Sequence, residues 1–289
     1  MLSERKNTIL QSLIQEYVIS AHPVASSTLV RYYVPRLSSA TVRNELSWLE
    51  NKGYIVAPHT SAGRMPTTTG YRTFVNSLLL HPQLIGATAQ RCGRREDMSM
   101  GVGESMSKPK GTSTTPHTLI SMQSLTSIAA ASDKLALVPE ILGLLAEQIE
   151  GLMVFWAPHL SNSVIHRGLP LLLTQPEFSE TSAALPIMQL LESHGELMTI
   201  FEDIMQTDCL HIKIGSEHKD SQLYEFSLVA MRFDCSCLIA STAAGKVPAA
   251  STGKNYGVVA LFGPTRMDYE RAIIGVSTLV KNLERPATR

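Results

Sequence analysis

The stretch that decides the fold is SSATVRNELSWLENKGYIVAPHTSAGRMPTTTGYRTFV, residues 38–75. Two serines open a run whose apolar residues recur every three or four positions, and Gly53 follows its end. Serine is a frequent N-cap, and glycine is frequent just past a helix C-terminus. The pattern therefore predicts a helix from Ser38 or Ser39 to about Asn51.

This predicted helix has two chemically different faces. At about 100° per residue, Val42, Leu46 and Leu49 form one narrow stripe that we expect to be buried. The opposite face holds Ala40, Arg43, Asn44 and Ser47. Because that face is small and polar, with one arginine and one asparagine, it can enter a groove of DNA.

The flanking sequence predicts three further helices and a short hairpin. The helices are expected to start after Ser3, at Ser26 or Ser27, and near Thr67. Between the third and fourth helices, residues 54–56 form a predicted strand and residues 64–66 a short partner, joined by a polar loop. The order of helix, helix, helix, strand, loop, strand and helix is that of a winged helix-turn-helix.

The charge distribution is uneven although the net charge is zero. Residues 1–80 hold eight lysines and arginines against four acidic residues, a net charge of +4, and the remainder carries −4. This asymmetry favours a polyanion-binding N-terminal part on a non-binding remainder.

The rest of the chain divides into a linker and an α+β domain. Residues 83–118 are rich in Gly, Ser, Thr, Met and Lys without a sustained period, which predicts a flexible linker. After residue 119 the patterns predict a helix over 183–203 and a last helix after Gly263 and Pro264. Predicted strands cover 209–214, 223–231, 233–241 and 256–262. We therefore expect domains at 1–82 and 119–289 on either side of the 83–118 linker.

Several function classes are disfavoured by the composition. Arg5 and Lys6 lead into an amphipathic run, so we expect no signal peptide, and glutamates interrupt the most apolar window, so we expect no membrane span. The four cysteines lack a metal-ligand spacing and indicate free thiols in a reducing compartment. No nucleophile elbow, phosphate loop or zinc motif is present, so we expect a cytoplasmic protein that is not an enzyme and has no cofactor or metal.

Residues 38–75 resemble the signature region of the heat-inducible transcription repressor HrcA family. The opening LSERKNTILQSLIQEYVISAHPVASSTLV, the segment RGLPLLLTQPEF at 167–178 and the segment GVVALFGPTRMDYER at 257–271 are also similar to that family. The resemblance implies an N-terminal winged helix followed by a GAF-like α+β domain with a dimerising insertion. The chain is shorter than typical members and departs from them around 85–140, so we expect the insertion to be shortened. Within the last motif, we interpret Arg266 and Asp268 as a structural pair at a strand-to-helix turn rather than as catalytic groups.

The resemblance, together with the exposed polar face, predicts DNA contacts from the third helix and from the loop after it. Arginine reads guanine and asparagine reads adenine through bidentate hydrogen bonds in the major groove. Gly63 is expected to permit close backbone approach, and Arg64 to enter the minor groove or hold a phosphate; the alternative for Arg64 is a salt bridge at the loop. The predicted DNA-binding residues are Ser38, Ser39, Thr41, Arg43, Asn44, Ser47, His59, Thr60, Ser61, Gly63 and Arg64.

The function implied by the resemblance is repression of heat-shock (chaperonin) operons. The expected partners are double-stranded DNA with an inverted-repeat operator, a second copy of the chain as a homodimer, and the chaperonin as modulator of activity, with release from the operator on heat stress. The alternative is a ligand-responsive winged-helix regulator whose GAF-like domain binds a small molecule.

Overall fold

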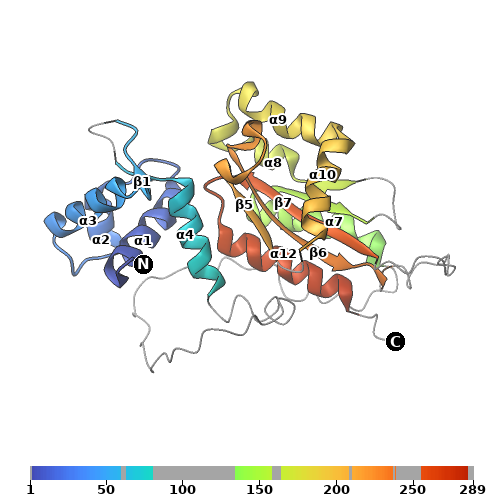
Figure 1. Cartoon of the computed structure of the whole chain (residues 1–289), viewed down its shortest axis with the longest axis horizontal. Coiled ribbons are helices and arrows are strands. Elements are labelled where there is room, and N and C mark those ends of the chain that lie inside the picture. The colour runs from blue at the N-terminus through green and yellow to red at the C-terminus, as the bar shows by residue number, and fades with distance from the viewer. Residues whose placement is uncertain are drawn as a thin grey trace.

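The computed structural model consists of a helical head and a larger body that lie side by side (Figure 1). It describes residues 2–59, 63–80, 134–157, 164–207, 210–236, 238 and 255–285. We call residues 2–80 the head and residues 134–285 the body. The linker predicted at 83–118 lies outside the described residues, and none of the described helices is long and apolar enough to span a membrane.

The head contains four helices and a two-stranded antiparallel sheet, in the order that the sequence predicts. The elements are α1 (Glu4–Ser20), α2 (Ser26–Tyr32), α3 (Ser39–Asn51), β1 (Ile55–Val56), β2 (Met65–Pro66) and α4 (Thr68–Leu79). The two strands pair through Ile55 opposite Pro66 and Val56 opposite Met65. Ser38 caps the start of α3 by accepting a hydrogen bond from the Thr41 backbone N–H at 3.1 Å.

The body is built on a five-stranded antiparallel sheet with strand order β4-β3-β7-β6-β5. Its strands are β3 (Leu152–Trp156), β4 (Ile165–Arg167), β5 (His211–Ile214), β6 (Phe226–Asp234) and β7 (Tyr256–Pro264). The two long strands β6 and β7 lie at the centre, and their side chains are almost entirely buried because helices cover both faces.

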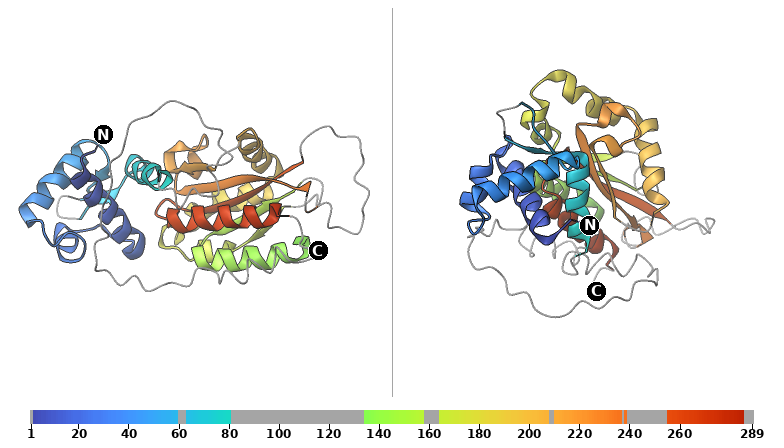
Figure 2. Two further views of the ribbon diagram at one scale, coloured as in Figure 1. Left: turned by 90° about the horizontal axis from the view of Figure 1, so that it is seen from below. Right: turned by 60° about the vertical axis from the view of Figure 1, so that its left-hand side comes forward.

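Helices cover the sheet on two sides, giving a mixed α+β arrangement (Figures 1 and 2). Alternate strand residues such as Val229 and Leu228 belong to two separate apolar clusters, one on each face. On one face lie α7 (Lys134–Ile149) and α12 (Tyr269–Glu284); on the other lie α8 (Leu169–Leu173), α9 (Thr181–Glu192) and α10 (His194–Met205). The 3-10 turns η1 (Pro176–Phe178), η2 (Gly215–Glu217) and η3 (Ser221–Leu223) lie between these elements.

Two predictions for the body are wrong in detail. The single helix predicted over 183–203 is two helices, because Ser193 leaves the helical conformation at φ −84° and ψ 86°. The break predicted between strands 223–231 and 233–241 is absent: β6 starts at Phe226 and runs without interruption to Asp234, because no turn residue lies between Met231 and Phe233. Residues 237 and 239–241 of the second predicted strand lie outside the described residues. The last helix does follow Gly263 and Pro264 as predicted, and it starts at Tyr269, where Asp268 caps it.

Candidate nucleic-acid interface

The outward face of α3 is the one that the helical angles predict. Val42 and Leu49 are fully buried and Leu46 is 5% exposed, so this stripe packs into the head. The opposite face consists of the exposed residues Ala40, Arg43, Asn44 and Ser47. Their small neighbours leave the arginine and asparagine side chains unobstructed on one side of the helix.

The acidic residues of α3 are neutralised by neighbouring elements. Glu45 pairs with Lys6 of α1 at 3.0 Å and with Arg5 at 3.5 Å, and Glu50 pairs with Arg64 at 2.9 Å. Within the described ranges, Arg43 has no carboxylate partner. The exposed face of α3 therefore offers an uncompensated positive charge to an approaching polyanion.

The start of α3 is shaped by its cap. The Ser38 hydroxyl accepts from the Thr41 N–H and lies 2.9 Å from the Thr41 hydroxyl, so these two side chains already bond to each other. Ser39 is half-buried on the first turn. The first backbone N–H groups of a helix lack internal partners and favour a phosphate, so this end suits the backbone of a nucleic acid.

The loop residues Arg64 and Gly63 contact other segments of the head in this structure. The guanidinium of Arg64 binds Glu50, with Nε 3.0 Å and Nη2 2.9 Å from Oε2, and its backbone pairs with Val24. The salt bridge named as the alternative is therefore what this structure shows for Arg64. Gly63 does permit a close backbone approach, but to the chain itself: an added Cβ would lie 2.5 Å from the carbonyl of Pro23.

The other predicted loop residues are only partly described. His59 is exposed at the start of the loop that follows β1. Thr60 and Ser61 lie outside the described residues, so their DNA contacts stay a prediction.

Trp48 is a partly exposed residue next to the polar face of α3 that the sequence reasoning missed. Trp48 is 37% exposed, and its ring stacks with that of Tyr54, with 6.4 Å between the ring centroids. The ammonium groups of Lys6 and Lys52 lie 4.9 and 6.0 Å from the centroid of the Trp48 ring. Its position beside the buried stripe of α3 was the available signal. Lys52 therefore adds a positive charge at the end of α3 beside the Trp48 ring, whereas the charge of Lys6 is already paired with Glu45.

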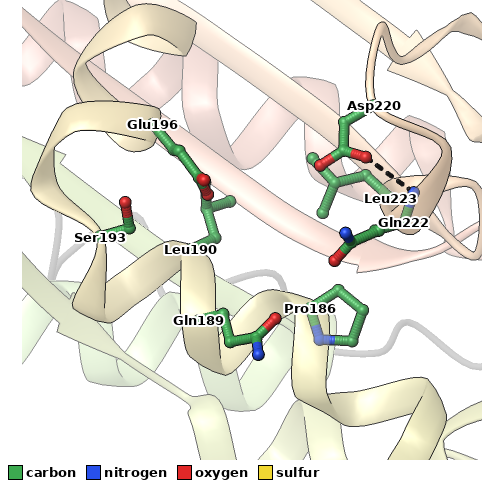
Figure 3. Close-up of a pocket in the computed structure, with 8 residues that line it drawn as sticks. All are labelled: Pro186, Gln189, Leu190, Ser193, Glu196, Asp220, Gln222 and Leu223. Atoms are coloured by element: carbon green, nitrogen blue, oxygen red, sulfur yellow. Dashed lines mark hydrogen bonds between the residues drawn. The ribbon is translucent and has the colours of Figure 1, made fainter.

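A small pocket lies in the body, far along the chain from α3 (Figure 3). Its volume is about 170 Å³, below the roughly 300 Å³ at which small-molecule sites usually begin. It is lined by Pro186, Gln189, Leu190, Ser193, Glu196, Asp220, Gln222 and Leu223. Among the described residues, no group of three histidines, cysteines or carboxylates could hold a metal ion.

One buried thiol and one buried imidazole have altered pKa values. Burial, with the nearby Asp234 and Glu284 carboxylates, raises the pKa of the Cys235 thiol to about 12, so this cysteine is a poor nucleophile. Burial lowers the pKa of His218 to about 4, and Lys213 acts in the same direction. Both groups are therefore neutral near pH 7 and act as core residues.

A family model described as "HrcA protein C terminal domain" matches residues 116–273, more than half of the chain. The chain belongs to the HrcA family. The matched region contains both of the segments at 167–178 and 257–271 whose sequence resembles this family.

HrcA relatives align along the whole chain. A protein named "Heat-inducible transcription repressor HrcA" from Brevibacillus brevis is 29% identical and covers 100% of this chain and 98% of its own length. One of the same name from Roseiflexus castenholzii is 29% identical over 95% of this chain and 91% of its own. The Brevibacillus alignment spans 355 positions, more than the 289 residues here, so that relative has segments without a counterpart in this chain.

One solved structure shares the fold. A crystal structure titled as a hypothetical protein at 2.2 Å resolution superposes with a TM-score of 0.65, at 16% identity, over 98% of both chains. The HrcA relatives are transcription repressors by name and not enzymes, in agreement with the predicted function class.

The contacts of Arg266 and Asp268 show that these two residues do not pair with each other, although a structural pair was predicted. Arg266 pairs with Glu177 of the segment at 167–178 rather than with Asp268. Asp268 instead accepts the Arg271 N–H at 3.1 Å as the cap of α12. Two segments that are 89 residues apart in the sequence thus meet at one arginine.

Proposed function

We propose that this chain is a heat-inducible repressor that binds an inverted-repeat operator as a dimer. In this proposal residues 1–82 are a winged-helix DNA-binding domain, residues 83–118 a linker, and residues 119–289 a GAF-like regulatory and dimerisation domain with a shortened insertion. The observation that carries the proposal is the exposed pair Arg43 and Asn44 on a helix whose own carboxylates are neutralised. Membership in the HrcA family supports it.

In the proposed complex, α3 enters the major groove. Arg43 would hydrogen-bond to guanine and Asn44 to adenine, each contact contributing about 1–3 kcal/mol of discrimination. Ser47 lies on the same face, and the N-terminal turn with Ser38, Ser39 and Thr41 would hold a phosphate. These phosphate contacts would set the register, whereas the base contacts would set the sequence.

The loop between β1 and β2 would act as the wing. Residues 59–61 and 63–64 lie at or near it, and Arg64 would have to leave Glu50, or bridge Glu50 and a phosphate, to contact DNA. Phosphate contacts outside the groove strengthen binding to any sequence.

A dimer follows from the symmetry of an inverted repeat. Two copies of α3 must reach half-sites that are one helical turn of DNA, or a multiple of it, apart. The body would hold the two copies together in the cytoplasm, and the chaperonin would keep the repressor active. On heat stress, unfolded proteins would occupy the chaperonin and repression would be lifted.

The test is fluorescence anisotropy on the labelled inverted repeat that precedes the chaperonin genes of the source genome. A single half-site and a scrambled duplex are run in parallel, each with and without chaperonin. We expect tight binding to the full repeat only, improved by chaperonin. Equal binding to all three duplexes would contradict operator recognition.

The alternative, a ligand-responsive regulator, receives no support from the described pocket. That pocket is small, and Glu196 and Asp220 at its rim would repel anionic ligands. We therefore retain DNA-dependent repression as the proposed function.

A further inference from the structure

The head and the body meet at two arginines that point in opposite directions across the contact. Arg266 of the body is 9% exposed and reaches α1 of the head. Arg72 of α4 in the head is half-buried and reaches β5 and η2 of the body. Each side of the interface therefore contributes one cation to groups on the other side.

Arg266 binds three groups at once. Its Nη1 donates to the backbone carbonyl of Val18 at 3.0 Å, its Nη2 donates to Gln175 Oε1 at 2.6 Å, and its Nε pairs with Glu177. The guanidinium fork is suited to such multiple, directional bonds. One side chain of the body thus joins the head to the turn that contains η1.

The contact with Val18 satisfies the end of a helix. The carbonyls in the last turn of a helix lack internal partners and carry partial negative charge, which a cation stabilises. The last turn of α1 contains no basic residue of its own. Arg266, 248 residues away in the sequence, supplies that cation.

Arg72 makes the second connection. Its Nε donates to Glu217 Oε1 at 2.7 Å and its Nη2 donates to the carbonyl of Ile212 at 2.9 Å. Glu217 is itself fixed, because its Oε2 accepts the backbone N–H of Ile214 at 2.9 Å. Arg72 therefore binds a carboxylate whose position is already fixed within the body.

The region between these arginines is incompletely bonded. The rings of Tyr71 and Tyr269 lie 5.7 Å apart across the interface. Tyr71 Oη and Glu177 Oε2 are buried without a hydrogen-bond partner among the described residues. Because unsatisfied buried polar groups weaken a contact, the arginines matter more here than in a fully apolar interface.

We propose that Arg266 and Arg72 are positioning residues for operator binding. They hold the head at one orientation on the body, so that both heads of a dimer reach their half-sites together. This inference rests on the proposed function. A head that can pivot keeps its own DNA contacts but lowers the effective concentration of the second head at its half-site.

The test combines the variants Arg266→Gln and Arg72→Gln with the control Arg271→Gln. Arg271 is an exposed arginine of α12 whose ion pair, with Asp268, stays within the body. Circular dichroism melts establish that each variant is folded. Arg266→Lys and Arg72→Lys serve as milder replacements, and Arg72→Lys retains the charge that faces Glu217.

The first readout requires no DNA. Nitroxide labels are coupled to p-acetylphenylalanine at the exposed positions Gln15 of α1 and Lys281 of α12, and their distance distribution is measured by pulsed electron resonance. We expect one narrow distribution for wild type and Arg271→Gln, and a broad one for the two glutamine variants. A narrow distribution in both glutamine variants would overturn the inference regardless of DNA binding.

The second readout is anisotropy on the inverted repeat, on the repeat with about five added base pairs (half a helical turn) between half-sites, and on one half-site. We expect the affinity of the glutamine variants for the repeat with native spacing to fall about tenfold or more, so that they no longer prefer this spacing. Their affinity for the single half-site should stay within about twofold of the wild-type value. Arg72→Lys should recover most of the loss. If the glutamine variants show broadened distance distributions but keep the wild-type preference for native spacing, the positioning role is refuted. If the wild-type protein itself does not prefer the repeat, both the proposed function and the positioning role are refuted.

Discussion

At the scale of single residues, Arg43 and Asn44 differ from the other polar residues of the head. Many polar side chains there are already engaged within the head, since Ser38 caps α3 and both Glu45 and Glu50 neutralise cations. Arg43 is exposed, without a carboxylate partner in the described part of the chain, beside an exposed amide. These two side chains can replace their hydrogen bonds to water with hydrogen bonds to the edges of bases.

The variant Arg43→Ala should lose sequence preference rather than general affinity. Loss of one bidentate contact costs about 1–3 kcal/mol, so operator affinity should fall roughly tenfold or more while affinity for random DNA falls much less. Anisotropy titrations on both duplexes give the ratio, with Arg167→Ala in the body as control. Equal losses on the two duplexes would mean that Arg43 contacts only phosphates.

The variant Glu50→Gln should strengthen binding to DNA of any sequence. It removes a negative charge from α3 and releases Arg64 from its ion pair, so that one more cation is available to a phosphate. The slope of log K against log salt should steepen by up to about 0.9. The matched control is Glu147→Gln on the exposed surface of α7, and a slope identical to wild type would show that Arg64 stays away from DNA.

At the scale of elements, the hairpin is fastened to the rest of the head. Val24, between α1 and α2, exchanges two backbone hydrogen bonds with Arg64, at 2.9 and 2.8 Å. Gly63 makes this possible because it brings no Cβ to the contact. The orientation of the hairpin is therefore coupled to the turn that precedes α2.

The variant Gly63→Ala should separate these two segments. Its Cβ would meet the backbone of Pro23 at 2.5 Å and of Val24 at 2.6 Å, so the structure must shift, at a cost of about 1–3 kcal/mol of the free energy of unfolding. Urea unfolding measures this loss. Gly143→Ala on α7, where an added Cβ meets nothing within 4 Å, should be neutral or stabilising. Equal stabilities for the two variants would contradict the close packing.

His218, which directly follows η2, should make the free energy of unfolding depend on pH. Burial lowers the pKa of His218 to about 4, below the ordinary value of 6.5, so the unfolded chain binds a proton more readily than the folded one between these values. Stability is fully present above pH 6.5 and is lost as the pH falls toward 4, by about 2 kcal/mol at pH 5 from this group. Urea unfolding at about pH 7.5 and about pH 5 should show a smaller decrease for His218→Gln than for wild type. The same decrease in both proteins would exclude His218 as the source.

The elements show which features the sequence could predict. The buried face of α3 follows from a local period, and the structure buries Val42, Leu46 and Leu49 as predicted. The continuity of β6 between Met231 and Phe233 was missed although no turn residue lies there, and the break at Ser193 was not predicted. The partners of Arg64 and Arg266 could not be predicted, because Glu50 and Val18 are brought to them only by the fold.

At the scale of the whole molecule, residues 1–80 carry a net charge of +4, because they hold few acidic residues, and the remainder of the chain carries −4. In the family of repressors to which the chain belongs, this division suits a polyanion-binding head carried on a body that does not compete for DNA. The contacts of Arg266 and Arg72 then hold the head at one orientation relative to the body.

The most direct test of the central claim is a photo-crosslink from α3 to the operator. A p-benzoylphenylalanine replaces Ser47, which is exposed beside Arg43 and Asn44, and a second protein carries it at Gln222 in the body as control. The account predicts adducts from position 47 at two symmetry-related places, one in each half-site, and none from position 222. Adducts from neither position on a duplex that the protein binds, or adducts in one half-site only, would contradict a dimer that reads its operator with α3.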